Sequence, residues 1–99
     1  MNIQKTLSGA ALTVALEGRL DTTTAPKLEE EELRGSVDGV SRLVFDLAKL
    51  EYISSAGLRV LLAMQKLMNR QGAMLLRNVH EAVMEVFEVT GFSDILRIE

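Results

Sequence analysis

The stretch LVFDLAKLEYISSAGLRVLLAMQKLMNRQGAMLLR, residues 43–77, decides the fold class. It opens with Leu43-Val44-Phe45-Asp46-Leu47, a nearly all-apolar run that is typical of a strand buried on both faces. Residues 58–70 then predict a helix that ends at Gly72, and residues 73–77 predict a second buried strand. Two parallel strands joined by a helix need a crossover connection, which is right-handed. The stretch therefore predicts an α/β unit.

Two strands are expected before this unit. Ile3, Lys5 and Leu7 alternate loosely, and Ser8-Gly9 predicts a turn. The following strand alternates cleanly between apolar positions and small or polar ones, which is typical of a half-buried strand; its apolar positions are Leu12, Val14 and Leu16. Gly18 is expected to break this strand, and residues 19–24 are expected to form a polar loop.

A first helix should begin near Pro26, which suits the first turn because its missing N–H would have no partner there. The four glutamates at positions 29–32 are expected early in this helix, where the helix dipole favours negative charge, and they are interpreted as a solvated face. Gly35-Ser36 should end the helix.

After the central unit, Asn78 and Glu81 are expected to cap a short helix that carries Val83, Val86 and Phe87 and closes at Gly91. Residues 95–98 predict a last short strand, while Lys49 and Glu51 fall in a loop before the central helix. The fold class is thus α/β. We expect a single mixed sheet of four to five strands, with helices mainly on one face, in one domain that spans residues 1–99.

Composition argues against several classes of function. The chain has 99 residues, 11 Lys and Arg against 14 Asp and Glu, a net charge of −3 and 4% aromatic residues, which argues against nucleic-acid binding. The absence of cysteine excludes a disulfide framework, a thiol nucleophile and a thiolate metal site. No apolar leader or membrane-spanning run is present, so we expect a cytoplasmic protein without membrane contact.

The sequence offers few residues that could carry out catalysis. His80 is the single histidine, and a surface or capping role is expected for it, so neither a nucleophile–base pair nor a zinc site is predicted. Asp21 and Asp46 both follow predicted strand segments and could together hold Mg²⁺ or transfer protons; the alternative is that each caps a turn or helix. We expect no enzyme activity, no cofactor and no metal.

Ser54 and Ser55 stand where a buried strand gives way to a helix. One interpretation is that a hydroxyl simply caps this helix. However, at about 100° per residue, Leu58 and Leu62 fall within the polar face of the helix. Two apolar side chains beside two serines indicate a small recognition patch.

Four segments of the sequence resemble the STAS domain, and more narrowly the bacterial anti-sigma factor antagonists. They are Gly18-Arg19-Leu20-Asp21, Thr24-Ala25, Phe45-Asp46-Leu47 and Ile53-Ser54-Ser55-Ala56-Gly57-Leu58. The resemblance implies a protein that binds a serine-kinase anti-sigma factor of the histidine-kinase-like ATPase fold and so frees a sigma factor. It also implies inactivation by phosphorylation of a serine that matches Ser55, and a serine phosphatase that acts on the phosphorylated form. The preceding residue is often aspartate in the family; here it is Ser54, which is therefore a second candidate acceptor.

The expected partner surface joins the loop after one strand to the start of the next helix, because both should lie at the same sheet edge. It comprises Asp21, Thr22, Thr23, Ser54, Ser55, Gly57, Leu58, Arg59 and Leu62. Leu58 and Leu62 are expected to be exposed anchors, with Arg59 at the rim. Two alternatives keep the STAS fold: a partner-switching protein with an output other than a sigma factor, and a sensor of a small molecule or nucleotide. The sensor would need a sizeable apolar cavity.

Overall fold

One four-stranded sheet forms the centre of the fold, with the strands in the spatial order β1-β2-β3-β4. The computed structural model describes residues 1–31 and 37–99. A tight turn after β1 (Asn2–Ser8) reverses the chain, so β1 pairs antiparallel with β2 (Ala11–Leu20). The strands β3 (Arg42–Ile53) and β4 (Ala73–Arg77) then add in parallel. The predicted mixed sheet is confirmed.

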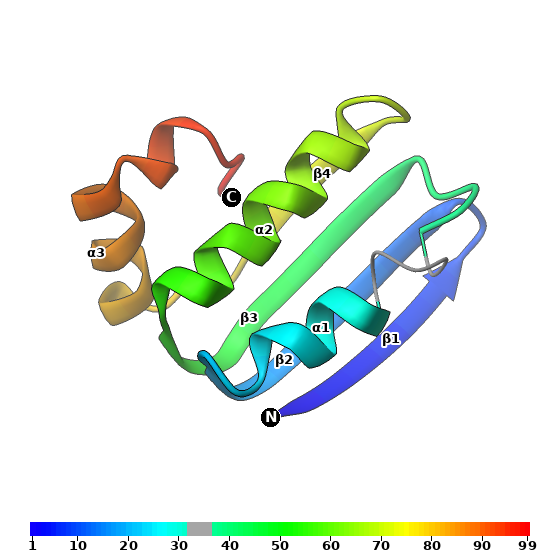
Figure 1. Cartoon of the computed structure of the whole chain (residues 1–99). Coiled ribbons are helices and arrows are strands. Elements are labelled where there is room, and N and C mark those ends of the chain that lie inside the picture. The colour runs from blue at the N-terminus through cyan, green and yellow to red at the C-terminus, as the bar shows by residue number, and fades with distance from the viewer. Residues whose placement is uncertain (32–36) are drawn as a thin grey trace.

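The helices lie together on one face of this sheet. They are α1 (Ala25–Glu31), α2 (Ser55–Met68) and α3 (Glu81–Thr90), followed by the short 3-10 helix η2 (Phe92–Asp94). Figure 1 shows them in front of the strands, with α2 lying along the sheet between α1 and α3. Because α1 and α2 each connect two parallel strands, crossovers of the same hand place them on the same face, as the sequence predicts.

The hydrophobic core fills the space between sheet and helices. Alternate residues of β2 and β3 point into it: Leu12, Val14, Leu16, Leu43, Phe45 and Leu47. From the helices, the core receives Leu58, Val60, Leu61, Met64, Met68, Val83 and Phe87. The apolar residues of the strands and those of the helices thus face one another in one layer. This burial fixes which face of each strand points toward the helices.

The second strand is longer than predicted, because Gly18 bends it without ending it. Gly18 has φ of +103°, which glycine adopts without a steric penalty, and the pairing register with β3 shifts between Gly18 and Arg19. A bulge of this kind changes the direction of a strand and lets pairing continue. Arg19 and Leu20, which we expected in a loop, are therefore the last two residues of β2.

The third strand also continues, so Lys49 and Glu51 lie within β3 and the predicted loop is wrong. Both side chains are exposed, which explains why their polarity suggested a loop. The last pair that β3 makes with β4 joins Asp46 to Arg77. Beyond it, among the described residues, β3 has a strand partner only on the β2 side, and polar residues are tolerated there.

The first helix begins as predicted, with Pro26 as its second residue. Its first turn contains no acidic residue, so the expected dipole effect of the glutamates is wrong. Glu29, Glu30 and Glu31 instead lie at the end of α1, where all three are exposed, in agreement with a solvated face. Glu32 and the helix end predicted at Gly35-Ser36 lie outside the described residues.

The C-terminal segment departs most from the prediction. Gly91, with φ of +81°, ends α3 as expected, but the chain then enters η2, and only Ile98 makes an isolated bridge, to Leu76. A fifth strand over residues 95–98 is therefore wrong. The residue that caps α3 is His80, whose side chain makes no capping bond, and the predicted pair of Asn78 and Glu81 is also wrong.

Within residues 1–31 and 37–99, no helix combines the length and the apolar character that crossing a bilayer requires.

Candidate functional site

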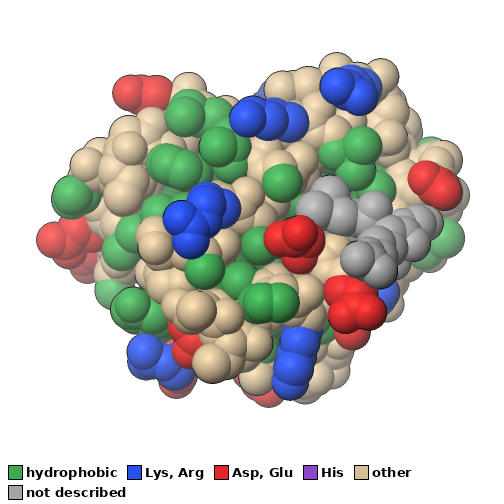
Figure 2. Space-filling model, viewed as in Figure 1, with side chains coloured by type: hydrophobic (Ala, Val, Ile, Leu, Met, Phe, Trp, Pro, Cys, Tyr) green, Lys and Arg blue, Asp and Glu red, His purple; other side chains and the backbone are tan. Residues whose placement is uncertain are grey.

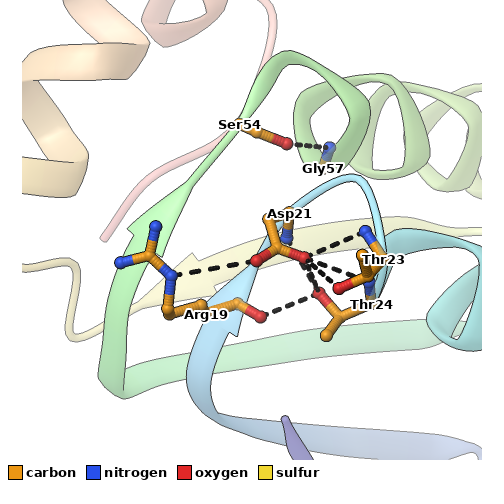
Figure 3. Close-up of polar contacts among 6 residues, drawn as sticks. All are labelled: Arg19, Asp21, Thr23, Thr24, Ser54 and Gly57. Carbon is orange, nitrogen blue, oxygen red and sulfur yellow. Dashed lines mark hydrogen bonds and ion pairs between the residues drawn. The ribbon is translucent and has the colours of Figure 1, made fainter.

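Asp21 organises the loop that joins β2 to α1. Its Oδ1 accepts hydrogen bonds from the Thr23 hydroxyl (2.8 Å), the Thr23 N–H (3.0 Å) and the Thr24 N–H (3.2 Å), as Figure 3 shows. The Thr24 hydroxyl closes the loop by donating to the carbonyl oxygen of Arg19 at 2.8 Å. The bond from the Thr23 hydroxyl, foremost among these, holds the pKa of Asp21 below its ordinary value of 3.8. Asp21 is therefore an ionised capping group at neutral pH.

Ser54 and Ser55 begin α2 beside this loop. The Ser54 N–H donates to the carbonyl oxygen of Leu20 at 2.9 Å, so the two loops meet at one edge of the sheet, as predicted. Ser54 is the N-cap, and its Oγ accepts from the Gly57 N–H at 3.5 Å. Ser55 is the first residue of α2 and is exposed, and its hydroxyl has no hydrogen-bond partner in the part of the chain that the structure describes. The two hydroxyls thus differ: one is engaged and one is free.

Gly57 is a packing residue, not the surface residue that we expected. It is buried, and a Cβ at this position would lie 2.7 Å from Cγ of Leu20 and 2.8 Å from Cγ1 of Ile53. Glycine therefore lets the first turn of α2 approach the ends of β2 and β3. This close approach places the first turn of α2 against the end of β2, directly before the Asp21 loop.

The expected pair of exposed leucines is wrong for Leu58. Only 4% of Leu58 is exposed, and it belongs to the hydrophobic core, whereas Leu62 is half-buried and Arg59 is exposed. From Val60 to Leu58, the buried arc of α2 spans about 160° at 100° per residue. The arc is this wide because α2 is covered by the sheet and has α1 and α3 at its sides (Figure 1). The surface at this helix start therefore retains Leu62 and Arg59.

The sequence matches a known protein family. The family model of the STAS domain matches residues 2–99. The chain belongs to the STAS domain family.

Named relatives narrow the comparison. The chain is 43% identical over 89 residues to BtrV of Bordetella bronchiseptica, a candidate anti-sigma factor antagonist, and the match covers 88% of this chain and 76% of BtrV. It is 34% identical over 88 residues to the anti-sigma-B factor antagonist of Listeria monocytogenes, and this match covers 87% of this chain and 76% of the relative.

Solved structures confirm the fold. The unphosphorylated form of the anti-sigma factor antagonist SpoIIAA matches with a TM-score of 0.77 at 16% identity, over 99% of this chain and 87% of SpoIIAA. An anti-sigma factor antagonist from Mycobacterium paratuberculosis matches with a TM-score of 0.87 at 23% identity, over 98% of this chain and 83% of the other. The STAS architecture of one mixed sheet with three helices is therefore shared.

Asp46 does not belong to the site of this STAS domain. We expected it at the end of a strand, but it lies within β3 and pairs with Ala15, which precedes Asp21 by roughly 20 Å of extended strand. Its Oδ1 accepts from the Ala48 N–H and from Nδ2 of Asn78, each at 3.1 Å. The two aspartates thus act as separate capping groups, and the structure does not bring them together as a metal or acid–base pair.

His80 lies on the surface, as the sequence predicts, and contacts the backbone. It is exposed at the N-cap position of α3, and its Nε2 contacts the carbonyl oxygen of Ala48. The described residues contain no group of three His, Asp or Glu side chains that could hold a metal ion.

A shallow hollow on the sheet face opposite the helices bears on the sensor alternative. It measures about 220 Å³ and is lined by charges of both signs, among them Glu17, Asp46 and Lys49. Sites for small ligands are mostly apolar and measure about 300–1,000 Å³. This hollow therefore gives the sensor alternative no support.

A stacked pair of side chains was missed by the sequence analysis. The register of β2 and β3 places Arg19 beside Tyr52, and Cζ of Arg19 lies 4.2 Å from the centroid of the Tyr52 ring. Leu20 and Ile53, the next residues, point into the core, so the pair lies on the opposite face of the sheet. Only the pairing of two strands far apart in the sequence could have revealed it.

Proposed function

We propose that this STAS protein is an anti-sigma factor antagonist whose binding is controlled by phosphorylation of Ser55. Unphosphorylated, it binds a serine-kinase anti-sigma factor of the histidine-kinase-like ATPase fold, and a sigma factor is thereby freed. The observation that carries the proposal is the free, exposed hydroxyl of Ser55 at the first residue of α2, beside the Asp21 loop. The named antagonists among the relatives support the same conclusion.

The choice of Ser55 over Ser54 rests on access. The Ser54 hydroxyl is half-buried and accepts the Gly57 N–H, so a kinase would have to break the N-cap to reach it. Loss of an N-cap costs about 1 kcal/mol. Ser55 carries no such bond among the described residues, and its side chain is presented to solvent.

A phosphate on Ser55 should leave the fold intact. It adds about −1.5 to −2 charges at the N-terminal turn of α2, where free N–H groups and the helix dipole favour an anion. The phosphate is therefore expected to act by weakening the binding of the partner. Asp21 already carries a negative charge in the neighbouring loop, so a protein that docks there must desolvate two anions.

The proposed partner surface follows the exposed residues of the site. It comprises Asp21, Thr22, Thr23, Ser54, Ser55, Arg59 and Leu62, with the buried Gly57 and Leu58 supporting it from below. Hydrophobic side chains reach the surface on the helix-covered side, with Lys and Arg among them, as Figure 2 shows. A surface that mixes apolar and charged side chains is typical of an interface that associates and dissociates.

In the proposed cycle, the kinase phosphorylates Ser55 and a serine phosphatase removes the phosphate. The protein itself acts by binding and not as an enzyme. Because the kinase consumes ATP and the output is a sigma factor, the cycle belongs to the cytoplasm.

Titration calorimetry with the kinase recovered by co-purification tests the switch. Ser55→Asp should bind at least ~100-fold more weakly, which corresponds to about 2.7 kcal/mol, with the circular dichroism spectrum of the parent. Ser55→Ala should bind but take up no phosphate from ATP.

The matched control is Ser8→Asp, because Ser8 is an exposed serine paired with Ala11 at the opposite end of β2. It should bind like the parent. Phosphopeptide mapping identifies the acceptor: label on Ser54 would correct the assignment, and label on neither serine would remove the switch.

A further inference from the structure

The pair of Arg19 and Tyr52 stands at the sheet edge that carries the proposed partner surface. Arg19 is the second-last residue of β2 and precedes the Asp21 loop, while Tyr52 is the second-last residue of β3 and precedes Ser54 by two positions. Each therefore lies within two residues of the proposed surface, but on the face of the sheet away from the helices.

Both side chains are exposed and held in place before any partner arrives. Tyr52 is 41% exposed and the Arg19 side chain 59% exposed, yet Arg19 stacks on the ring at 4.2 Å and its Nε lies 3.8 Å from Oδ2 of Asp21. An arginine fixed on two sides has already lost much of the rotamer freedom that binding would otherwise remove. Tyrosine and arginine are also the residue types in which binding energy concentrates at interfaces.

The donors that Arg19 leaves free define what it can bind. Figure 3 shows Nε facing Asp21, while the two terminal nitrogens point away from it. Within residues 1–31 and 37–99, these terminal nitrogens have no hydrogen-bond or ion-pair partner. A guanidinium presents them as a planar fork that matches the two oxygens of a carboxylate.

We infer that Arg19 and Tyr52 form a second anchor of the partner surface, which receives an acidic side chain and an adjacent apolar side chain of the anti-sigma factor. The carboxylate would take the free fork of Arg19, and the apolar group would cover the exposed part of the Tyr52 ring. This inference rests on the proposed function, because it extends the same surface around the edge of the sheet.

Calorimetry with the co-purified kinase tests the anchor in the chain of residues 1–99. Tyr52→Ala and Arg19→Gln should each weaken binding by about tenfold or more, whereas Tyr52→Phe, which keeps the ring, should stay within about twofold of the parent. Because the anchor pairs opposite charges, Arg19→Gln should also reduce the dependence of the affinity on salt.

Two controls remove an exposed cation and trim an exposed apolar side chain outside the proposed surface. Lys49→Gln removes an exposed cation whose Nζ lies 3.7 Å from Oε2 of Glu17, and Val89→Ala trims a side chain that is 80% exposed on α3. Both should bind like the parent. Tyr52→Ala does not touch Asp21, so it separates loss of the anchor from loosening of the Asp21 loop in Arg19→Gln.

The outcomes distinguish this inference from the proposed function. Parent-like binding by both Tyr52→Ala and Arg19→Gln, together with weak binding by Ser55→Asp, overturns the anchor and leaves the switch standing. A parent protein that binds no kinase overturns both. Weak binding by Tyr52→Ala and Arg19→Gln with parent-like controls supports the anchor.

Discussion

Asp21 shows how one carboxylate can shape a loop through local hydrogen bonds. It accepts bonds from Thr23 and Thr24, and its other oxygen lies near Arg19. A loop residue with so many local bonds is rigid, and a rigid loop presents Thr22 and Thr23 in one geometry. A phosphate on Ser55 would add further negative charge to the surface that already carries this carboxylate.

The lowered pKa of Asp21 predicts how this loop responds to acid. Because the folded pKa lies below the ordinary 3.8, the bonds are complete above that pH and are lost as the pH falls through the folded pKa. In a proton–nitrogen correlation titration, the Thr23 and Thr24 amide shifts should move with a midpoint below 3.8. Asp21→Asn should abolish the movement, and a midpoint above 3.8 would contradict the observed bonds.

At the scale of elements, α2 links the proposed switch residue Ser55 to the core. Its start is pressed against β2 and β3 at Gly57, and four of its apolar residues, Val60, Leu61, Met64 and Met68, are buried along its length. A helix fixed in this way can accept a charge on Ser55 without moving. The buried face of α2 and the proposed binding face meet between Leu58 and Leu62, which lie one turn apart.

This boundary predicts opposite behaviour for two neighbouring leucines. Leu58→Ala should lower the free energy of unfolding by about 2–5 kcal/mol, because it leaves a cavity in the core. Leu62→Ala should cost far less stability, since the side chain is half-buried, but should weaken kinase binding by about 1–3 kcal/mol. Urea denaturation and calorimetry on both variants measure the contrast. A stability loss in Leu62→Ala equal to that of Leu58→Ala would place both leucines in the core.

At the scale of the whole molecule, a single core holds sheet and helices together. The sheet carries the helices on one face, and α3 closes the core beside α2 through Val83 and Phe87. A domain of this size has a total stability of about 5–15 kcal/mol, so one large buried side chain accounts for much of it. Phe87 is fully buried and is one of the largest side chains of this core.

Phe87→Ala should therefore lower the free energy of unfolding by about 3–5 kcal/mol. The measurement is the midpoint of urea denaturation followed by circular dichroism. Val89→Ala serves as the control on the same helix, because Val89 is 80% exposed, and it should stay within about 0.5 kcal/mol of the parent. An unchanged midpoint in Phe87→Ala would mean that α3 does not close the core.

What the sequence by itself determined is local in origin. Period-two alternation over Leu12, Val14 and Leu16 identified a half-buried strand, and the apolar run around Phe45 identified a strand within a parallel unit. The order of strands and helices then limited the fold to one mixed sheet with helices on one side. That a serine hydroxyl caps the central helix also followed from residue type and position, since an N-cap bond spans only three residues, while the structure decided for Ser54 over Ser55.

Only the tertiary structure decided what depends on residues far apart in the chain. Leu58 is buried because α2 is covered by the sheet and has a helix on either side, which a pattern along one helix does not record. Asp46 lies mid-strand because β3 continues along β2 beyond the end of β4. Arg19 meets Tyr52 because parallel pairing sets Leu20 opposite Ile53. The physical reason is common to all three: burial and pairing are set by which segments lie alongside one another, whereas local patterns record only what each segment prefers.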